Sequence, residues 1–243
     1  MAILEALAAR RDGLGVSDLA RALSMSKPRV HRYLRSLVAL GYAEQREEGG
    51  RYRVGVKVYL LGQQAAGTID IVEASRNTIR RLSGSLGQTV TVSRMIQDAA
   101  VIVGVAVGAA ALEIQSRVGT RYEPHVSAHG KIGLAYDDKL LSKVLEGPMK
   151  AWTRQSVVDP EELAREIQTI RETGWAAAPE ESVLGINAVA LPVFNYDDRC
   201  VGSIAVIGSI PVVPLPPDHT TLAPVRVPAT QDSRELRWHG RSK

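Results

Sequence analysis

Cysteine is almost absent from this sequence, since Cys200 is the single cysteine among 243 residues. A lone cysteine has no partner in its own chain, which excludes a disulfide-stabilised scaffold and favours a reducing compartment. The chain also lacks an apolar run of about 18 residues, so the sequence predicts no transmembrane helix. The N-terminus shows no basic region followed by an apolar core, and we expect no signal peptide and a cytoplasmic location.

Patterns typical of catalysis are scarce as well. No phosphate-binding glycine loop is found, and no His or Asn pattern around Cys200 indicates a nucleophile. His125 and His129 lie four residues apart, which makes a metal site conceivable. Pro124 and Ser127 indicate a helix that starts between them, and the two imidazoles then need not share a face. We therefore predict no metal, no cofactor and no enzyme activity.

What the chain has is charge that is unevenly distributed. Residues 1–65 contain 11 Lys or Arg and 6 Asp or Glu, a net charge of +5. Residues 66–224 contain 14 and 18, a net −4, and residues 225–243 contain 5 and 2, a net +3, within a total of +4. A basic block in a small N-terminal segment is typical of nucleic-acid contact, with a solvated surface as the alternative. An enzyme, the main alternative class, would leave this block unexplained.

Three short helices and a hairpin are predicted in the N-terminal segment. Apolar residues at helical spacing indicate helices over residues 1–11, 18–23 and 27–40, with Ser17 and Ser26 as the N-caps of the second and third. Two short strands, 42–46 and 51–54, follow around a Gly-Gly turn. This order is that of a winged helix-turn-helix, whose third helix enters the major groove of DNA.

The third predicted helix and the wing supply the candidate DNA contacts. Arg29 and Arg32 are expected to read bases, because a guanidinium binds guanine in a bidentate way. Lys27, Arg35 and Arg51 are better placed for phosphates. The alternative is a small three-helix domain that binds protein, and His31 alone is more often a surface residue than a specific contact. The full predicted DNA-binding set is Ser17, Ser26, Lys27, Pro28, Arg29, His31, Arg32, Arg35 and Arg51.

Four stretches of this segment carry a family resemblance. They are residues 16–20 (Val-Ser-Asp-Leu-Ala), 26–34 (Ser-Lys-Pro-Arg-Val-His-Arg-Tyr-Leu), 37–42 (Leu-Val-Ala-Leu-Gly-Tyr) and 52–55 (Tyr-Arg-Val-Gly). Together they resemble the DNA-binding domain of the IclR (isocitrate-lyase regulator) family. In that family the third helix typically runs Ser/Pro-x-Val-x-Arg-Leu-Leu and ends Leu-Gly-Tyr, and the wing closes with Tyr-x-Leu-Gly.

The rest of the chain mixes predicted helices and strands. The predicted helices are 57–64 (a linker), 72–86, one that starts at Ala128 with Ser127 as its N-cap, 137–145, and 160–172 with Asp159 as its N-cap. The predicted strands are 89–95, 100–107, 112–118 and 201–207.

Two motifs in this part resemble the same family. Residues 118–131 resemble its effector-domain signature Val-Gly-x-Arg-x-Pro-x-His-x-[Thr/Ser]-Ala-x-Gly-Lys-Ala, and residues 174–193 resemble Gly-Tyr-Ala…Glu-Glu…Gly-x-x-x-[Val/Ile]-Ala-x-Pro-[Val/Ile]. For Gly130 and Lys131 alone, the alternative is helix packing plus a surface charge.

The resemblance covers about residues 1–212 and implies an α+β chain. An N-terminal winged helix-turn-helix domain would be joined by a linker helix to a GAF-like α/β effector-binding domain. The expected divisions are 1–56 (DNA-binding domain), 57–70 (linker helix), 71–212 (effector domain) and 213–243 (a Pro-rich basic tail, partly disordered).

The resemblance also implies a small-molecule effector site. In relatives that sense small keto acids, two backbone amides at a helix start hold the carboxylate, and apolar and polar side chains line the pocket. The matching positions here are Ala128 and His129 for the amides, Ile114, Tyr122 and Ile186 for the walls, and Ala178, Ala188, Ala205 and Ile207 for the polar side chains.

All four positions that are polar in those relatives are apolar in this chain. A buried polar group without partners costs about 1–3 kcal/mol. We therefore expect a carboxylic acid more apolar than glyoxylate. The alternative is that these alanines are plain core and that the domain has lost ligand sensing.

The sequence thus predicts a transcriptional regulator whose partners are a double-stranded DNA operator, a small-molecule effector and further copies of itself, as a homodimer or dimer of dimers, without a membrane. The alternative is a GAF-like small-molecule-binding protein or an enzyme whose N-terminal domain is an interaction module.

Overall fold

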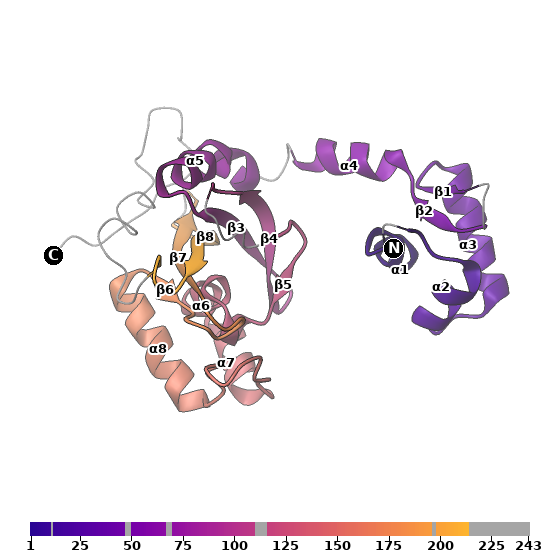
Figure 1. Ribbon diagram of the computed structural model, residues 1–243. Helices are drawn as coiled ribbons and strands as arrows, with labels where there is room; N and C mark the ends of the chain where they lie inside the picture. Colours follow the sequence, from indigo (N-terminus) through magenta and orange to yellow (C-terminus); the bar gives the residue numbers. More distant parts are fainter. Residues whose placement is uncertain (11, 47–49, 67–69, 110–115, 196–197, 214–243) are drawn as a thin grey trace. The chain divides into compact units, whose positions relative to one another are not determined.

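The structure is a computed structural model that describes residues 1–10, 12–46, 50–66, 70–109, 116–195 and 198–213. The chain divides into two compact units, residues 1–69 and the residues from 70 onward (Figure 1). Within the described residues, no helix is long and apolar enough to cross a membrane. The predicted turn residues 47–49 and the Pro-rich tail beyond residue 213 lie outside the described part.

The N-terminal unit has the predicted order of three helices and a hairpin. Its elements are α1 (Ala2–Ala8), α2 (Val16–Ala22), α3 (Lys27–Ala39), β1 (Ala43–Gln45), β2 (Tyr52–Val54) and α4 (Val56–Ala66). Strands β1 and β2 pair antiparallel, with Ala43 opposite Val54. The predicted helices, hairpin and linker helix of this unit are therefore confirmed.

A small apolar core fixes these elements against one another. Leu7 from α1, Leu19 from α2, and Val30 and Leu34 from α3 are buried, and Tyr52 from β2 packs with them. The positions 30 and 34 are four apart, so they lie on one face of α3. The opposite face of α3 is left for solvent or for a partner.

The N-cap of α2 differs from the prediction. Gly15, not Ser17, holds this position, with φ −80° and ψ 164°. The backbone N–H and C=O of Leu14 both bond to Tyr52 at 2.9 Å, so the chain is extended up to Leu14 and the helix can begin directly after it. Ser17 lies in the first turn of α2, where its side chain is exposed.

The C-terminal unit is built on one six-stranded sheet with strand order β5-β4-β3-β8-β7-β6, in which all neighbouring strands are antiparallel. The strands are β3 (Thr89–Ile96), β4 (Ala99–Ala106), β5 (Arg121–Tyr122), β6 (Ala176–Ala177), β7 (Ile186–Phe194) and β8 (Cys200–Ser209). The helices are α5 (Asp70–Leu86), α6 (Ala128–Ala135), α7 (Asp138–Glu146) and α8 (Pro160–Thr173), with a short 3-10 helix, η1 (Pro124–Val126), before α6.

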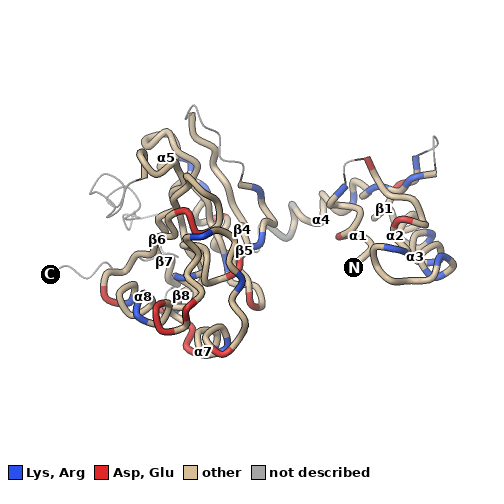
Figure 2. The backbone as a smooth tube through the Cα atoms, turned by 60° about the horizontal axis from the view of Figure 1, so that its bottom comes forward, with Lys and Arg blue, Asp and Glu red and all other residues tan. Residues whose placement is uncertain are grey.

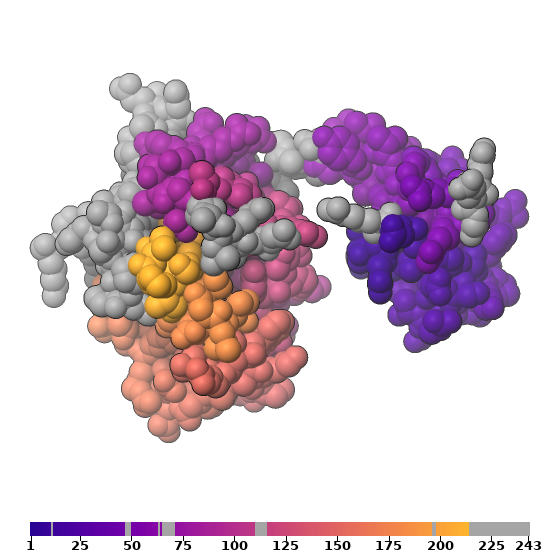
Figure 3. Space-filling model, viewed as in Figure 1, coloured from indigo at the N-terminus to yellow at the C-terminus, as the bar shows by residue number. Residues whose placement is uncertain are grey.

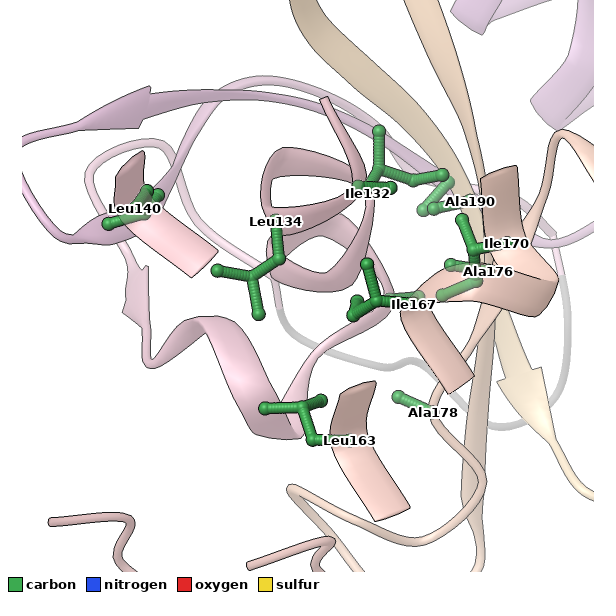
Figure 4. Packing of buried hydrophobic residues seen from close by; sticks show 12 residues of the cluster. Ile132, Leu134, Leu140, Leu163, Ile167, Ile170, Ala176, Ala178 and Ala190 are labelled. Atoms are coloured by element: carbon green, nitrogen blue, oxygen red, sulfur yellow. The ribbon is translucent and has the colours of Figure 1, made fainter. Parts of the chain in front are cut away.

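Helices cover both faces of the sheet. Helix α5 packs against β3, β4 and β8, and the space-filling view shows its side chains directly over the strand drawn in yellow (Figure 3). Helix α6 packs against β6, β7 and β8 on the other face and also against α8. Ile132 and Leu134 of α6 meet Leu163 and Ile167 of α8 in one apolar cluster (Figure 4).

One predicted strand is displaced. Residues 112–115 of the predicted strand 112–118 lie outside the described part, and Val118 and Gly119 form a turn. Among the residues that the structure describes in this stretch, pairing with β4 begins at this turn, where the Gly119 N–H bonds to Ile102 O at 2.8 Å. The strand that follows is therefore β5, Arg121–Tyr122.

Candidate functional site

The exposed face of α3 carries the candidate DNA contacts. Residues 27–29, 31, 32 and 35 are all exposed, while Val30 and Leu34 on the other face are fully buried. Figure 2 shows the Lys and Arg positions distributed along this helix. The structure thus places Lys27, Pro28, Arg29, His31, Arg32 and Arg35 on one accessible surface of the N-terminal unit.

The N-terminus of α3 is not closed by a side chain. Ser26 holds the N-cap position, as predicted, but makes no side-chain hydrogen bond to the helix, and it is exposed. The first amides of a helix have no partner within the helix, and a phosphate oxygen satisfies such groups well. Pro28 adds no N–H to this end.

The wing contributes two exposed cations, Arg46 and Arg51, that are not engaged in an ion pair among the described residues. Arg51 lies at the start of the returning strand and is exposed. Arg53 is held instead by Glu44, with Nη2 and Oε2 2.8 Å apart. The described part of the wing therefore has guanidiniums available for a phosphate at Arg51, as predicted, and at Arg46, which was not among the predicted contacts.

In the C-terminal unit, the predicted amide pair lies at the start of α6. The Ser127 hydroxyl accepts the Gly130 N–H at 3.1 Å, which confirms the predicted cap. Since that cap uses the third amide of the helix, the N–H groups of Ala128 and His129 are the ones that helix geometry leaves for a ligand. A Cβ on Gly130 would lie 2.3 Å from Pro124 Cα, so glycine is required for the approach of η1 to α6.

Most of the predicted pocket positions meet on the sheet face that α6 covers. Ala188 pairs with Ile207 across β7 and β8, and the Ala178 N–H bonds to Ala188 O at 3.1 Å. Ala178, Ala188 and Ala205 belong to the same apolar cluster as Ala128.

Three predicted pocket residues stand apart from this group. Ile186 is the first residue of β7 and is half-buried. Tyr122 lies in β5, and strands β4 and β3 separate it from β8 in the sheet. Ile114 lies outside the described residues.

A buried polar network that the sequence did not predict crosses the same sheet face. The His129 ring bonds to Thr91 Oγ1 through Nε2 at 2.8 Å and to Ser203 Oγ through Nδ1 at 2.7 Å, and Ser203 bonds to Ser93 at 3.0 Å. Burial lowers the pKa of His129 to about 3, so the imidazole is neutral at pH 7. The ring therefore ties the start of α6 to β3 and β8, which argues against its use as a metal ligand.

Lys131 is not a surface charge, because it is fully buried. Its Nζ lies 2.8 Å from Glu166 Oε1 of α8 and 2.5 Å from Glu181 Oε1. Burial raises the pKa of Glu181 to about 7, an effect that the positive charge of Lys131 opposes. The ion cluster joins α6 to α8 and to the segment that follows β6. Lys131 and Glu181 belong to the Gly-Lys and Glu-Glu motifs of the sequence, but nothing in the sequence indicated that these two motifs lie together.

Cys200 has the environment of an unreactive thiol. Burial raises the pKa of its thiol to about 11, and the reactive form of cysteine is the thiolate. His125, the other histidine considered as a metal ligand, bonds through Nε2 to Lys150 O at 3.0 Å.

Comparisons with known proteins agree with this architecture. Residues 1–47 match the family described as IclR helix-turn-helix domain, and residues 63–226 match the one described as Bacterial transcriptional regulator IclR C-terminal. The chain is 31% identical over 217 residues to the glycerol operon regulatory protein of Streptomyces griseus, covering 89% of this chain and 85% of that protein.

Two solved structures have the same fold. An IclR transcriptional regulator from Alicyclobacillus acidocaldarius superposes with a TM-score of 0.83 at 25% identity, covering 92% of this chain and 91% of that one. An IclR homologue from Microbacterium hydrocarbonoxydans, complexed with 4-hydroxybenzoate, gives a TM-score of 0.81 at 18% identity, covering 92% and 93%.

Proposed function

Since the chain belongs to the IclR family of DNA-binding transcriptional regulators, we propose that α3 and the wing bind a double-stranded operator under the control of a small-molecule effector. The exposed basic face of α3 is the observation that supports this most directly. Arg29 and Arg32 read bases, and Lys27, Arg35 and Arg51 bind phosphates. Ser17, Ser26, Pro28 and His31 complete the proposed interface, and this DNA partner implies action in the cytoplasm.

We propose further that the protein acts as a homodimer or a dimer of dimers. One winged helix covers little DNA, and two copies on a two-part operator give the affinity and the length of sequence that a regulator needs. Helix α4 presents exposed apolar residues, with Tyr59 64% and Leu60 52% exposed, which favours self-association through this helix.

The proposed effector is a carboxylic acid more apolar than glyoxylate. Its carboxylate is held by the amides of Ala128 and His129, and its body lies against Ala178, Ala188, Ala205 and Ile207, with Ile186, Tyr122 and Ile114 as further walls. The apolar cluster that contains three of these alanines supports the choice. An effector acts by binding the DNA-competent and incompetent arrangements with different affinity.

Selection of bound sequences from a random DNA pool tests the operator function. We expect one enriched sequence, bound about 1–3 kcal/mol more weakly after Arg29→Ala or Arg32→Ala because each substitution removes a base contact. Arg165→Ala is the matched control, since this arginine is 71% exposed on α8 of the other unit. An unchanged sequence and affinity in both α3 variants would refute the role of α3. No enrichment at all, with turnover in a screen of small acids, would favour the enzyme alternative.

Calorimetric titration tests the effector separately. Benzoate and 4-hydroxybenzoate are suitable aromatic acids, the latter because a solved homologue carries it, and glyoxylate is the polar comparison. We expect an aromatic acid to bind and glyoxylate to bind weakly or not at all. Tight glyoxylate binding would show that the apolar positions do not set the choice, and no binding by any acid would support a domain that has lost sensing.

A further inference from the structure

The side chain of Tyr33 is an aromatic group that the proposed interface does not use. It lies in the middle of α3, is 41% exposed, and does not belong to the apolar core of its unit. Both proposed base-reading arginines approach its ring. Arg29 Cζ lies 5.9 Å and Arg32 Cζ 5.8 Å from the ring centroid.

The contact with Arg29 follows from helix geometry. Arg29 is four residues before Tyr33 and therefore lies one turn away on the same face, while Arg32 is its direct neighbour in the chain. A guanidinium within about 6 Å of an aromatic centroid is attracted by the electrons of the ring face. Hydrogen bonding to Arg29 and the charges of Arg29 and Arg32 lower the pKa of the Tyr33 hydroxyl. Tyr33 thus interacts with both arginines at once.

We propose that Tyr33 is a positioning residue for DNA recognition, which holds the guanidiniums of Arg29 and Arg32 in the orientation in which they read bases. The inference rests on the proposed operator function and extends it to a residue outside the predicted interface. Its physical basis is entropy, because a free arginine side chain samples many rotamers and must give them up when it binds. A ring that already restricts two arginines reduces that cost at the moment of binding.

A positioning role affects binding to the operator sequence, whereas a phosphate contact affects binding to all DNA alike. Ordered guanidiniums matter for bidentate base contacts, which demand a defined geometry, and matter little for diffuse attraction to phosphates. Loss of the ring should therefore weaken operator binding more than binding to unrelated DNA. The slope of affinity against salt concentration should not change, since the number of phosphates contacted stays the same.

The test compares Tyr33→Leu and Tyr33→Phe in the full-length protein, on the selected operator and on unrelated DNA of equal length. We expect Tyr33→Leu to weaken operator binding about five- to thirtyfold, the equivalent of two exposed cation–π contacts, and Tyr33→Phe to retain most of the affinity because it keeps the ring. Val38→Ala is the matched control, since Val38 lies on the same helix and is 39% exposed. Thermal melting of each variant confirms that an exposed substitution leaves the fold intact.

A double-mutant cycle with Arg29→Ala gives the decisive readout. If Tyr33 acts through Arg29, the loss from Tyr33→Leu becomes smaller in the Arg29→Ala background. Fully additive losses, equal losses on operator and unrelated DNA, or tighter operator binding after removal of the ring would each overturn the inference. A wild-type protein that selects no DNA sequence would instead refute the proposed function, so the two failures are distinguishable.

Discussion

The two units of this protein place their charges in opposite ways. In the described residues, every buried polar or charged side chain lies in the C-terminal unit, including His129, Lys131 and Glu181. The N-terminal unit has an apolar core, and all of its described cations, most of them on α3 and the wing, are exposed. Exposed cations are free to meet an external anion, whereas buried ones must be satisfied by their own chain. The comparison therefore separates charges that recognise a partner from charges that hold a domain together.

The helix N-termini show the same division. In the C-terminal unit, Ser127, Asp137 and Asp159 each accept a hydrogen bond from the helix that they precede. In the N-terminal unit, none of the described N-caps of α1, α2 and α3 makes such a bond. Helices α6, α7 and α8 are thus closed by side chains of their own unit, whereas the end of the proposed recognition helix is left open.

The largest change in stability is expected from replacing the buried ammonium of Lys131. Lys131→Met should lower the free energy of unfolding by about 3–5 kcal/mol, because it leaves the carboxylates of Glu181 and Glu166 without their counter-charge. Urea unfolding, followed by far-UV circular dichroism, measures this loss. Lys143→Met is the matched control, since Lys143 is 65% exposed and pairs with Asp98 at 2.6 Å. We expect the control to cost less than about 1 kcal/mol.

Equal losses of unfolding free energy in Lys131→Met and Lys143→Met would show that the burial of Lys131 does not increase its contribution to stability. If Lys131→Met fails to accumulate as a folded protein, the double variant Lys131→Met/Glu181→Gln provides the answer, because it removes the more deeply buried of the two carboxylates that the single variant leaves without a counter-charge. Recovery of folding in the double variant is the expected result, and a failure to recover would mean that the unpaired charge of Glu181 does not account for the loss.

Local chemistry in the sequence was enough to predict the α-helices of both units and the strands β1, β2, β3, β4 and β8, but it did not predict β5, β6 or β7 as strands. Helical spacing placed α3, and the side chains of Ser127 and Asp159 marked the starts of α6 and α8. The Ser17 cap was wrong because a long-range backbone pair, Leu14 with Tyr52, decides where α2 begins. Local propensity contains no information about such a pair.

The polar contacts inside the C-terminal unit could not be predicted from the sequence. His129 and Ser203 are 74 residues apart, and Lys131 and Glu181 are 50 apart, and each pair meets only because the sheet and α8 bring them together. The exposure of the Tyr33 ring could not be predicted from the sequence either, because it depends on how α3 packs. The contact of this ring with Arg29, in contrast, is local.

The pH dependence of the unfolding free energy tests the effect of burying one group, Glu181. Glu181 has an ordinary pKa of 4.5 and a folded-state pKa of about 7, raised by burial. Its folded-state pKa lies above the unfolded one, so its contribution to stability is complete below pH 4.5 and is lost as the pH rises through 7. Glu181 alone should therefore lower the unfolding free energy between about pH 4.5 and 7, by at most about 3 kcal/mol. The buried, neutral His129, whose pKa is lowered from 6.5 to about 3, acts in the opposite direction up to about pH 6.5, so the contribution of Glu181 is read as the difference between the wild type and a Glu181 variant.

Glu181→Gln should remove the contribution of Glu181 to the pH dependence, because an amide does not titrate. Urea unfolding across the same pH range measures it, with Glu161→Gln as the control, a carboxylate that is 87% exposed on α8. A wild type that gains stability relative to Glu181→Gln as the pH rises through this range would contradict the burial effect and indicate that the attraction of Lys131 dominates the titration of Glu181.

The smallest expected effect compares the capped and the open helix ends. Asp159→Ala removes a side chain that accepts the Glu162 N–H at 2.8 Å, and should lower the free energy of unfolding by about 1 kcal/mol. Ser26→Ala removes no such bond, so stability should change by only a few tenths of a kcal/mol, whereas affinity for DNA should fall because the hydroxyl is no longer available at the open end of α3. Thermal melting and DNA titration of both variants separate the two outcomes. A Ser26→Ala variant that loses stability but keeps its DNA affinity would place Ser26 with the structural caps of the other unit.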